Sequence, residues 1–175
     1  MLSYDLRLFR PSGGASASLE RDASTACAVE HESIIDEPRP RDPEKDARRE
    51  RLAAALYASV PRLDRLAFDH AAIAAVLDCT PADARLRIRY EELNDTRAGM
   101  QVTVFDDAAT VTLAHETTAD GGEPESRNNI RTLWRVLEVC EREAGLRAFD
   151  HQLNRVLTLE ADFEAVLACY LAPSP

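Results

Sequence analysis

The chain has 175 residues, of which 45% are hydrophobic and 30% are charged, and this length and composition suit one globular domain over residues 1–175. Its 31 acidic and 21 basic residues give a formal net charge of −10, which argues against nucleic acid and anionic membranes as partners, because both require a cationic surface. The amino terminus does not have the pattern of a signal peptide, and no apolar run approaches the roughly 20 residues that span a bilayer, so we expect a cytoplasmic protein.

The amino-terminal residues predict a β-strand. Tyr4, Leu6 and Leu8 alternate with other residues at the period of two that is typical of a strand. Residues 11–41 follow, rich in Ser, Ala, Pro and acids, and we expect them to form a mobile loop within the domain. Gly13-Gly14 does not have the spacing of a phosphate-binding loop.

Three helix starts come next. The Asp-Pro-Glu sequence at 42–44 is a strong signal, because aspartate caps free amides, proline fits the first helical position and glutamate suits the positive end of the helix dipole. An apolar helix face then continues to Pro61. A second helix is predicted over 69–78, with Ile73, Val76 and Leu77 buried in the core, and the Thr-Pro pair at 80–81 opens one further turn.

Residues 86–114 predict a three-stranded antiparallel meander. Apolar and polar residues alternate over 86–91, 100–105 and 110–113, and turn-forming residues separate these strands. Asp106-Asp107 is better explained as a turn cap than as a metal site. Because one face of the meander is apolar, we predict an α+β fold, in which amphipathic helices pack mainly on one face of an antiparallel sheet.

The strongest helix signal covers about residues 123–144. Its apolar residues recur at spacings of three and four and form one stripe: Ile130, Leu133, Trp134, Leu137 and Cys140. Burial of each large side chain contributes roughly 1.5–3 kcal/mol, so this helix should be a main support of the fold. Short strands over 146–149 and 155–159 and a closing helix over 163–170 complete the prediction.

The sequence has no recognisable catalytic or metal-binding motif. The four cysteines have no CxxC pair and are best explained as reduced small hydrophobes: Cys27, Cys79, Cys140 and Cys169. Cys27 and His31 stand four apart, but two ligands do not complete a zinc site. We therefore predict no catalytic residue, no metal and no cofactor, and keep as an alternative a small enzyme that pairs His115 or His151 with an acid.

One group of acidic residues is a candidate partner-binding surface. In an up-and-down meander, the turn at 94–99 and the segment after Leu113 lie at the same end of the sheet. This arrangement would bring together Glu91, Glu92, Asp95, Glu116, Asp120, Glu123 and Glu125. Such a group is either a solvated rim or the anionic half of an interface that steers a basic protein partner.

Several short motifs resemble a group of small uncharacterised bacterial proteins. The motifs are Tyr4-Asp5-Leu6, Glu92-Leu93-Asn94, and Phe149-Asp150-His151-Gln152 before Arg155-Val156-Leu157. His151 stands where the pattern of that group has proline. Proteins of this kind look like the immunity or accessory partners of secreted bacterial toxins, so the resemblance implies a binding role; it implies no known activity and assigns no functional residues.

The leading hypothesis is a non-catalytic binding protein that neutralises a cognate toxin, for example a basic toxin domain, through its acidic surface. A structural scaffold subunit is a third hypothesis beside the small enzyme, and it predicts a large exposed apolar patch together with a stable oligomer.

Overall fold

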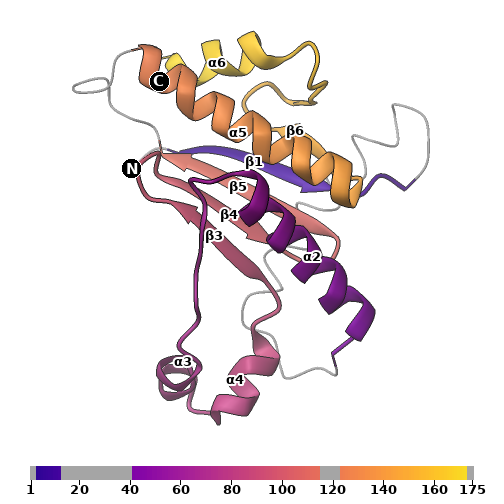
Figure 1. Cartoon of the computed structure of the whole chain (residues 1–175), viewed down its shortest axis with the longest axis vertical. Coiled ribbons are helices and arrows are strands. Elements are labelled where there is room, and N and C mark those ends of the chain that lie inside the picture. Colours follow the sequence, from indigo (N-terminus) through magenta and orange to yellow (C-terminus); the bar gives the residue numbers. More distant parts are fainter. Residues whose placement is uncertain (1–2, 13–40, 115–122, 173–175) are drawn as a thin grey trace.

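Within residues 3–12, 41–114 and 123–172, which a computed structural model describes, seven strands form one antiparallel sheet (Figure 1). The strand order is β2-β3-β4-β5-β1-β6-β7. The strands are β1 (Ser3–Phe9), β2 (Asp64–Arg65), β3 (Glu91–Asp95), β4 (Met100–Val104), β5 (Ala108–Ala114), β6 (Arg147–Asp150) and β7 (Arg155–Val156). The amino-terminal strand β1 lies between β5 and β6, so it joins the meander to the carboxy-terminal hairpin.

The predicted meander is present as β3–β4–β5 at one side of this larger sheet, but its first strand begins later than predicted. The prediction placed that strand at 86–91, whereas helix α4 (Pro81–Arg87) includes its first two residues and β3 begins only at Glu91. A capping box starts α4: the Thr80 hydroxyl accepts from the Asp83 amide at 3.1 Å, and the Asp83 carboxylate accepts from the Thr80 amide at 3.4 Å. The apolar alternation near Leu86 is therefore the end of a helix.

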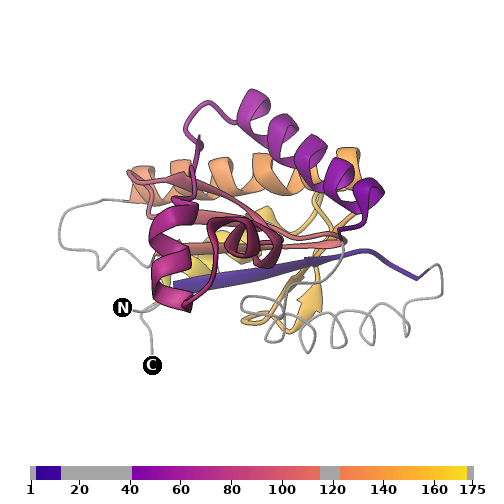
Figure 2. The same ribbon diagram turned by 90° about the horizontal axis from the view of Figure 1, so that it is seen from below.

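Two long helices cover one face of the sheet, as predicted (Figures 1 and 2). Helix α2 (Pro43–Ser59) packs against α5 (Glu123–Ala144), and α6 (Phe163–Leu171) packs against the other side of α5. Beneath them, one cross-strand row is at most 1% exposed: Leu93, Val102, Val111 and Leu6. The predicted stripe of α5 is confirmed, because Ile130, Leu133, Trp134, Leu137 and Cys140 are all buried.

The cysteines in the described residues are not paired in disulfides: Cys79, Cys140 and Cys169. Burial raises the pKa of the Cys140 thiol to about 12, so it stays protonated at neutral pH and packs as a hydrophobe. Cys27 and His31 lie outside the described residues, as does most of the segment predicted to be a mobile loop.

Helices α3 (His70–Leu77) and α4 form a helical hairpin between β2 and β3. The Asp69 carboxylate caps α3 by accepting from the Ala71 and Ala72 amides, each at 3.0 Å. The two helices pack mainly on each other and project from the end of the molecule opposite α6 (Figure 1). The hairpin therefore adds little to the main core.

A buried hydrogen-bond cluster joins β1 to the turn after β6. The Asp150 carboxylate is fully buried and accepts from the Tyr4 hydroxyl and from the Gln152 and Leu153 amides, the last two at 2.8 and 2.9 Å. The Tyr4 ring also meets the edge of the Tyr170 ring on α6, at 6.1 Å between centroids. Tyr4 and Asp150, which belong to the first and last of the short motifs in the sequence, thus meet in the core. Their contacts link the amino-terminal strand to the carboxy-terminal part of the chain, and we call them the clamp between the chain ends.

The Tyr4 phenol makes the free energy of unfolding depend on pH in the alkaline range. Burial, and then its hydrogen bond to Asp150, raise the pKa of Tyr4 far above its ordinary value of 10.0. The unfolded chain therefore releases this proton above about pH 10 while the folded chain keeps it, so the free energy of unfolding falls by up to about 1.4 kcal/mol per pH unit through this residue. Urea unfolding between about pH 9 and pH 11 should show a shallower fall for Tyr4→Phe than for the natural chain. Equal slopes would contradict this assignment.

Candidate functional site

Asp95, one of the acids predicted to meet a partner, instead holds a turn together. It is the last residue of β3 and is only 2% exposed. Its carboxylate accepts from the amides of Arg97 and Ala98 at 3.1 and 3.2 Å, and it pairs with the Arg62 guanidinium at 2.7 Å. These bonds leave Asp95 inside the fold, where a partner does not reach it.

Glu91, at the start of β3, lies away from the predicted cluster. Glu91 is opposite Val104, at the far end of the strand from the β3–β4 turn, and pairs with Arg65 at 2.9 Å. Its predicted place at the turn is wrong because β3 begins at this residue. The Glu92 carboxylate accepts from the side-chain amide of Asn94 at 2.9 Å.

The remaining acids of the predicted surface follow β5. Glu123 and Glu125 are exposed in the first turn of α5, where carboxylates stabilise the positive end of the helix dipole. Glu116 and Asp120 lie outside the described residues, as does His115. Of the five described acids, Asp95 is buried and Glu91 lies at the other end of β3, so these two do not belong to the predicted acidic surface. His151 is exposed and stacks edge-on against Phe149, with ring centroids 5.1 Å apart.

Substitution should show that Asp95 contributes more to the free energy of unfolding than an exposed acid does. Asp95→Ala removes two turn hydrogen bonds and leaves Arg62 without its acid, so we expect a loss of about 1.5–3 kcal/mol in the free energy of unfolding. Glu125→Ala, the control, should stay within about 0.5 kcal/mol of the natural chain. Urea unfolding measures both. Equal losses in the two variants would show that the bonds of Asp95 do not stabilise the fold.

An apolar surface on the helical hairpin is a stronger candidate for binding. The sequence of α3 is His-Ala-Ala-Ile-Ala-Ala-Val-Leu, yet only Ala74 is buried. Val76 is 85% exposed, and nearby Leu66 is 41% exposed. A helix that is apolar around its whole circumference is normally buried, so α3 lacks the cover that its composition calls for within the described part of the chain.

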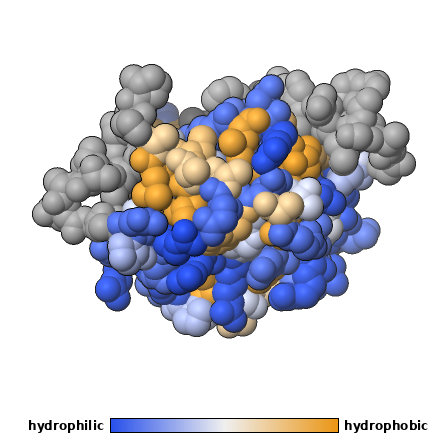
Figure 3. Space-filling model, turned by 90° about the horizontal axis from the view of Figure 1, so that it is seen from above, coloured by the Kyte–Doolittle hydropathy of each residue, from blue (hydrophilic) through white to orange (hydrophobic). Residues whose placement is uncertain are grey.

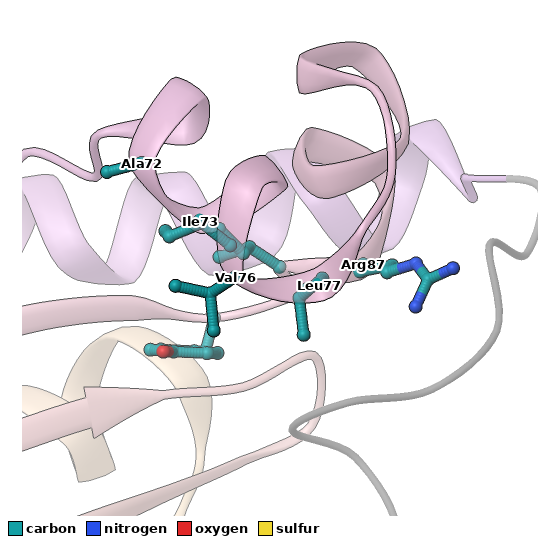
Figure 4. A pocket seen from close by; sticks show the side chains of 7 residues that line it. Ala72, Ile73, Val76, Leu77 and Arg87 are labelled. Carbon is teal, nitrogen blue, oxygen red and sulfur yellow. The ribbon is translucent and has the colours of Figure 1, made fainter.

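The hairpin encloses a groove of about 320 Å³ that we call the hairpin groove (Figure 4). It is lined by Ala72, Ile73, Val76, Leu77, Arg87, Ile88 and Tyr90. The Tyr90 ring is fixed between two other aromatic rings, with centroids 5.1 Å from Phe68 and 6.1 Å from Phe105. A rigid aromatic residue thus joins the hairpin to the start of β3.

The polar groups of the hairpin groove are hydrogen-bond donors. Burial, and then the Glu92 carboxylate, raise the pKa of Tyr90, so its hydroxyl keeps its proton at neutral pH and can donate. Arg87 is the one charged residue in the lining. It lies at the Leu77 end of the groove, and its guanidinium extends beyond the apolar side chains (Figure 4).

The opposite end of the molecule has a different surface. Seen from the side of α6, apolar residues are interrupted by hydrophilic ones (Figure 3). The large hydrophobic side chains that are exposed in the described residues are Tyr57, Leu66 and Val76, of which the last two belong to the hairpin and its approach. The exposed large aliphatic side chains of the described residues therefore lie on the hairpin and its approach, and one of them, Val76, lines the hairpin groove.

Sequence reasoning found α3 but assigned Ile73, Val76 and Leu77 to the core. The signal that it missed is a short helix that is apolar on every side and is followed at once by the capped start of another short helix. Two helices of eight and seven residues cannot bury that much apolar surface against each other.

Comparison of the chain with protein-family models, with curated protein sequences and with solved structures gave no match. Across residues 3–12, 41–114 and 123–172, no three His, Cys, Asp or Glu side chains are arranged to hold a metal ion. Over the same ranges, the helices are too short or too polar to cross a membrane.

Proposed function

We propose that this chain is a non-catalytic protein-binding domain that presents the hairpin groove to its partner. The observation that carries this proposal is the 85% exposure of Val76 on a helix made almost wholly of apolar residues. Covering apolar surface contributes about 25 cal/mol per Å², so a partner that packs against α3 gains affinity from it. Interface centres are typically apolar and enriched in tyrosine and arginine, and the hairpin groove contains one of each.

The specific form of this function is neutralisation of a partner protein in the cytoplasm, such as a bacterial toxin domain. The net charge of −10 supports a partner that is basic overall, because long-range attraction would speed their encounter. The resemblance of the motifs around Tyr4, Glu92 and Asp150 to those of immunity partners supports the same role. In this proposal, net charge speeds the encounter of the two proteins, and contacts in the hairpin groove stabilise the complex.

Co-purification tests the proposal. The full-length chain is immobilised and exposed to an extract of its native host, in parallel with Val76→Asp and with Arg51→Ala, an exposed control on α2. We expect one protein to be retained by the natural chain and the control and lost from Val76→Asp. That protein, once purified, should lose its activity when mixed with an equimolar amount of this chain. A retained set that is the same for all three baits would refute the proposed surface.

A further inference from the structure

We propose that the occupant of the hairpin groove is a short amphipathic segment of the partner, whose aliphatic side chains fill the groove and whose flanking carboxylate pairs with Arg87. This inference rests on the proposed function and specifies the chemistry of the partner's segment.

The apolar part of the occupant follows from the lining. Ile73, Val76 and Leu77 come from α3, and Ile88 follows α4. The close view shows the labelled aliphatic side chains in one row along α3 (Figure 4). A groove of about 320 Å³ has room for a few side chains and not for a folded domain. Aliphatic side chains at helical or extended spacing on a short segment match this shape.

The carboxylate of the occupant is inferred from the surroundings of the Arg87 guanidinium. Its guanidinium forms no ion pair with the described residues, and its Nε is buried without a hydrogen-bond partner among them. A half-buried cation beside aliphatic side chains gains from a carboxylate, because charge-assisted hydrogen bonds are strong and arginine can bind both carboxylate oxygens. Figure 4 places Arg87 past Leu77, so the carboxylate belongs beside the apolar residues of the occupant and not among them.

A second copy of this chain fits the hairpin groove less well. Two-fold association would place the same lining on both sides of the interface, so two Arg87 side chains would meet a lining that has no carboxylate. Each copy also carries a net charge of −10, which repels the other. A different chain that supplies its own acid avoids both costs.

Peptide selection tests this chemistry. A displayed library of random peptides of about 12 residues is selected on the full-length chain, and the enriched peptides are then measured on variants. We expect them to combine two or more aliphatic residues with a flanking Asp or Glu. Arg87→Glu should weaken their binding by about tenfold or more, and selection on that variant should instead enrich Lys or Arg. Arg51→Glu, which adds the same charge on exposed α2, should leave binding unchanged.

Three outcomes would overturn the inference. The first is a set of enriched peptides without acidic residues. The second is an affinity for the selected peptides that the Arg87→Glu substitution leaves unchanged. Arg87→Gln serves in its place if the charge reversal alters the far-ultraviolet circular dichroism. The third is a dimer in light scattering that Val76→Asp disrupts, which would identify a second copy as the occupant.

The inference and the proposed function fail separately. If the native partner is lost from Val76→Asp but binds Arg87→Glu and Arg87→Gln as tightly as the natural chain, the carboxylate contact is refuted and the binding surface stands. If Val76→Asp retains the native partner, the proposed binding surface itself is refuted.

Discussion

Val76→Asp is expected to raise the dissociation constant for the partner by at least about 30-fold, which corresponds to the loss of one interface hot spot. The valine is 85% exposed and lies in the middle of the aliphatic row of α3. Aspartate at that place would put a charge in an apolar contact without an arranged counter-charge, and complex formation would have to desolvate it. Titration calorimetry with the purified partner measures the change.

The fold should tolerate this substitution. Because Val76 has few contacts in the free chain, the free energy of unfolding of Val76→Asp should stay within about 0.5 kcal/mol of the natural value. Val76→Ile keeps an aliphatic side chain and should bind within a few fold of the natural chain. Tight binding by Val76→Asp would show that the interface lies on another surface of the protein.

Asp150→Ala should cause the largest loss of stability among single substitutions of the buried polar residues. The carboxylate is fully buried and serves the Tyr4 hydroxyl and the two amides of the turn after β6. Its removal leaves these three donors without an acceptor, for which we expect a loss of about 3–5 kcal/mol. Urea unfolding measures this loss.

Tyr4→Phe is the matched comparison, because it removes one of the three donors and keeps the carboxylate with its turn amides. We expect this variant to lose about 1–2 kcal/mol. If Asp150→Ala were no less stable than Tyr4→Phe, the turn bonds would have no part in the clamp between the chain ends.

The elements that sequence predicted well are those specified by local pattern. The Asp42 cap and Pro43 start α2 as expected, and the apolar stripe of α5 is buried as expected. The strand β1 was also predicted, but its place between β5 and β6 depends on pairing with residues about 100 or more positions away. No local pattern encodes such a partner.

The shift of β3 shows how two local signals compete. Alternation over 86–91 suits a strand, while the capping box of Thr80 and Asp83 favours a helix that extends through Arg87. The helix prevails because its cap satisfies free amides at the start and its arginines suit the negative end of the helix dipole. The strand then begins at Glu91, and this shift also moves Glu91 away from the predicted acidic cluster.

The candidate site was harder to predict because exposure is a property of tertiary structure. Asp95 was assigned to the surface as a turn acid, but Arg62, from a separate segment, and the amides of its own turn hold it inside. Conversely, the aliphatic residues of α3 were assigned to the core because a short apolar helix usually lies there. The exposure of Val76 and the partial burial of Ile73 and Leu77 follow from the projection of the hairpin away from the main layer of helices, which no residue pattern specifies.

The most direct test of the central claim is amide hydrogen exchange of the full-length chain with and without its purified partner. If the hairpin groove is the binding surface, exchange should slow most over residues 70–90, which comprise α3, α4 and the approach to β3. Slowing that is confined to α2 and α5, with residues 70–90 unchanged, would contradict the claim.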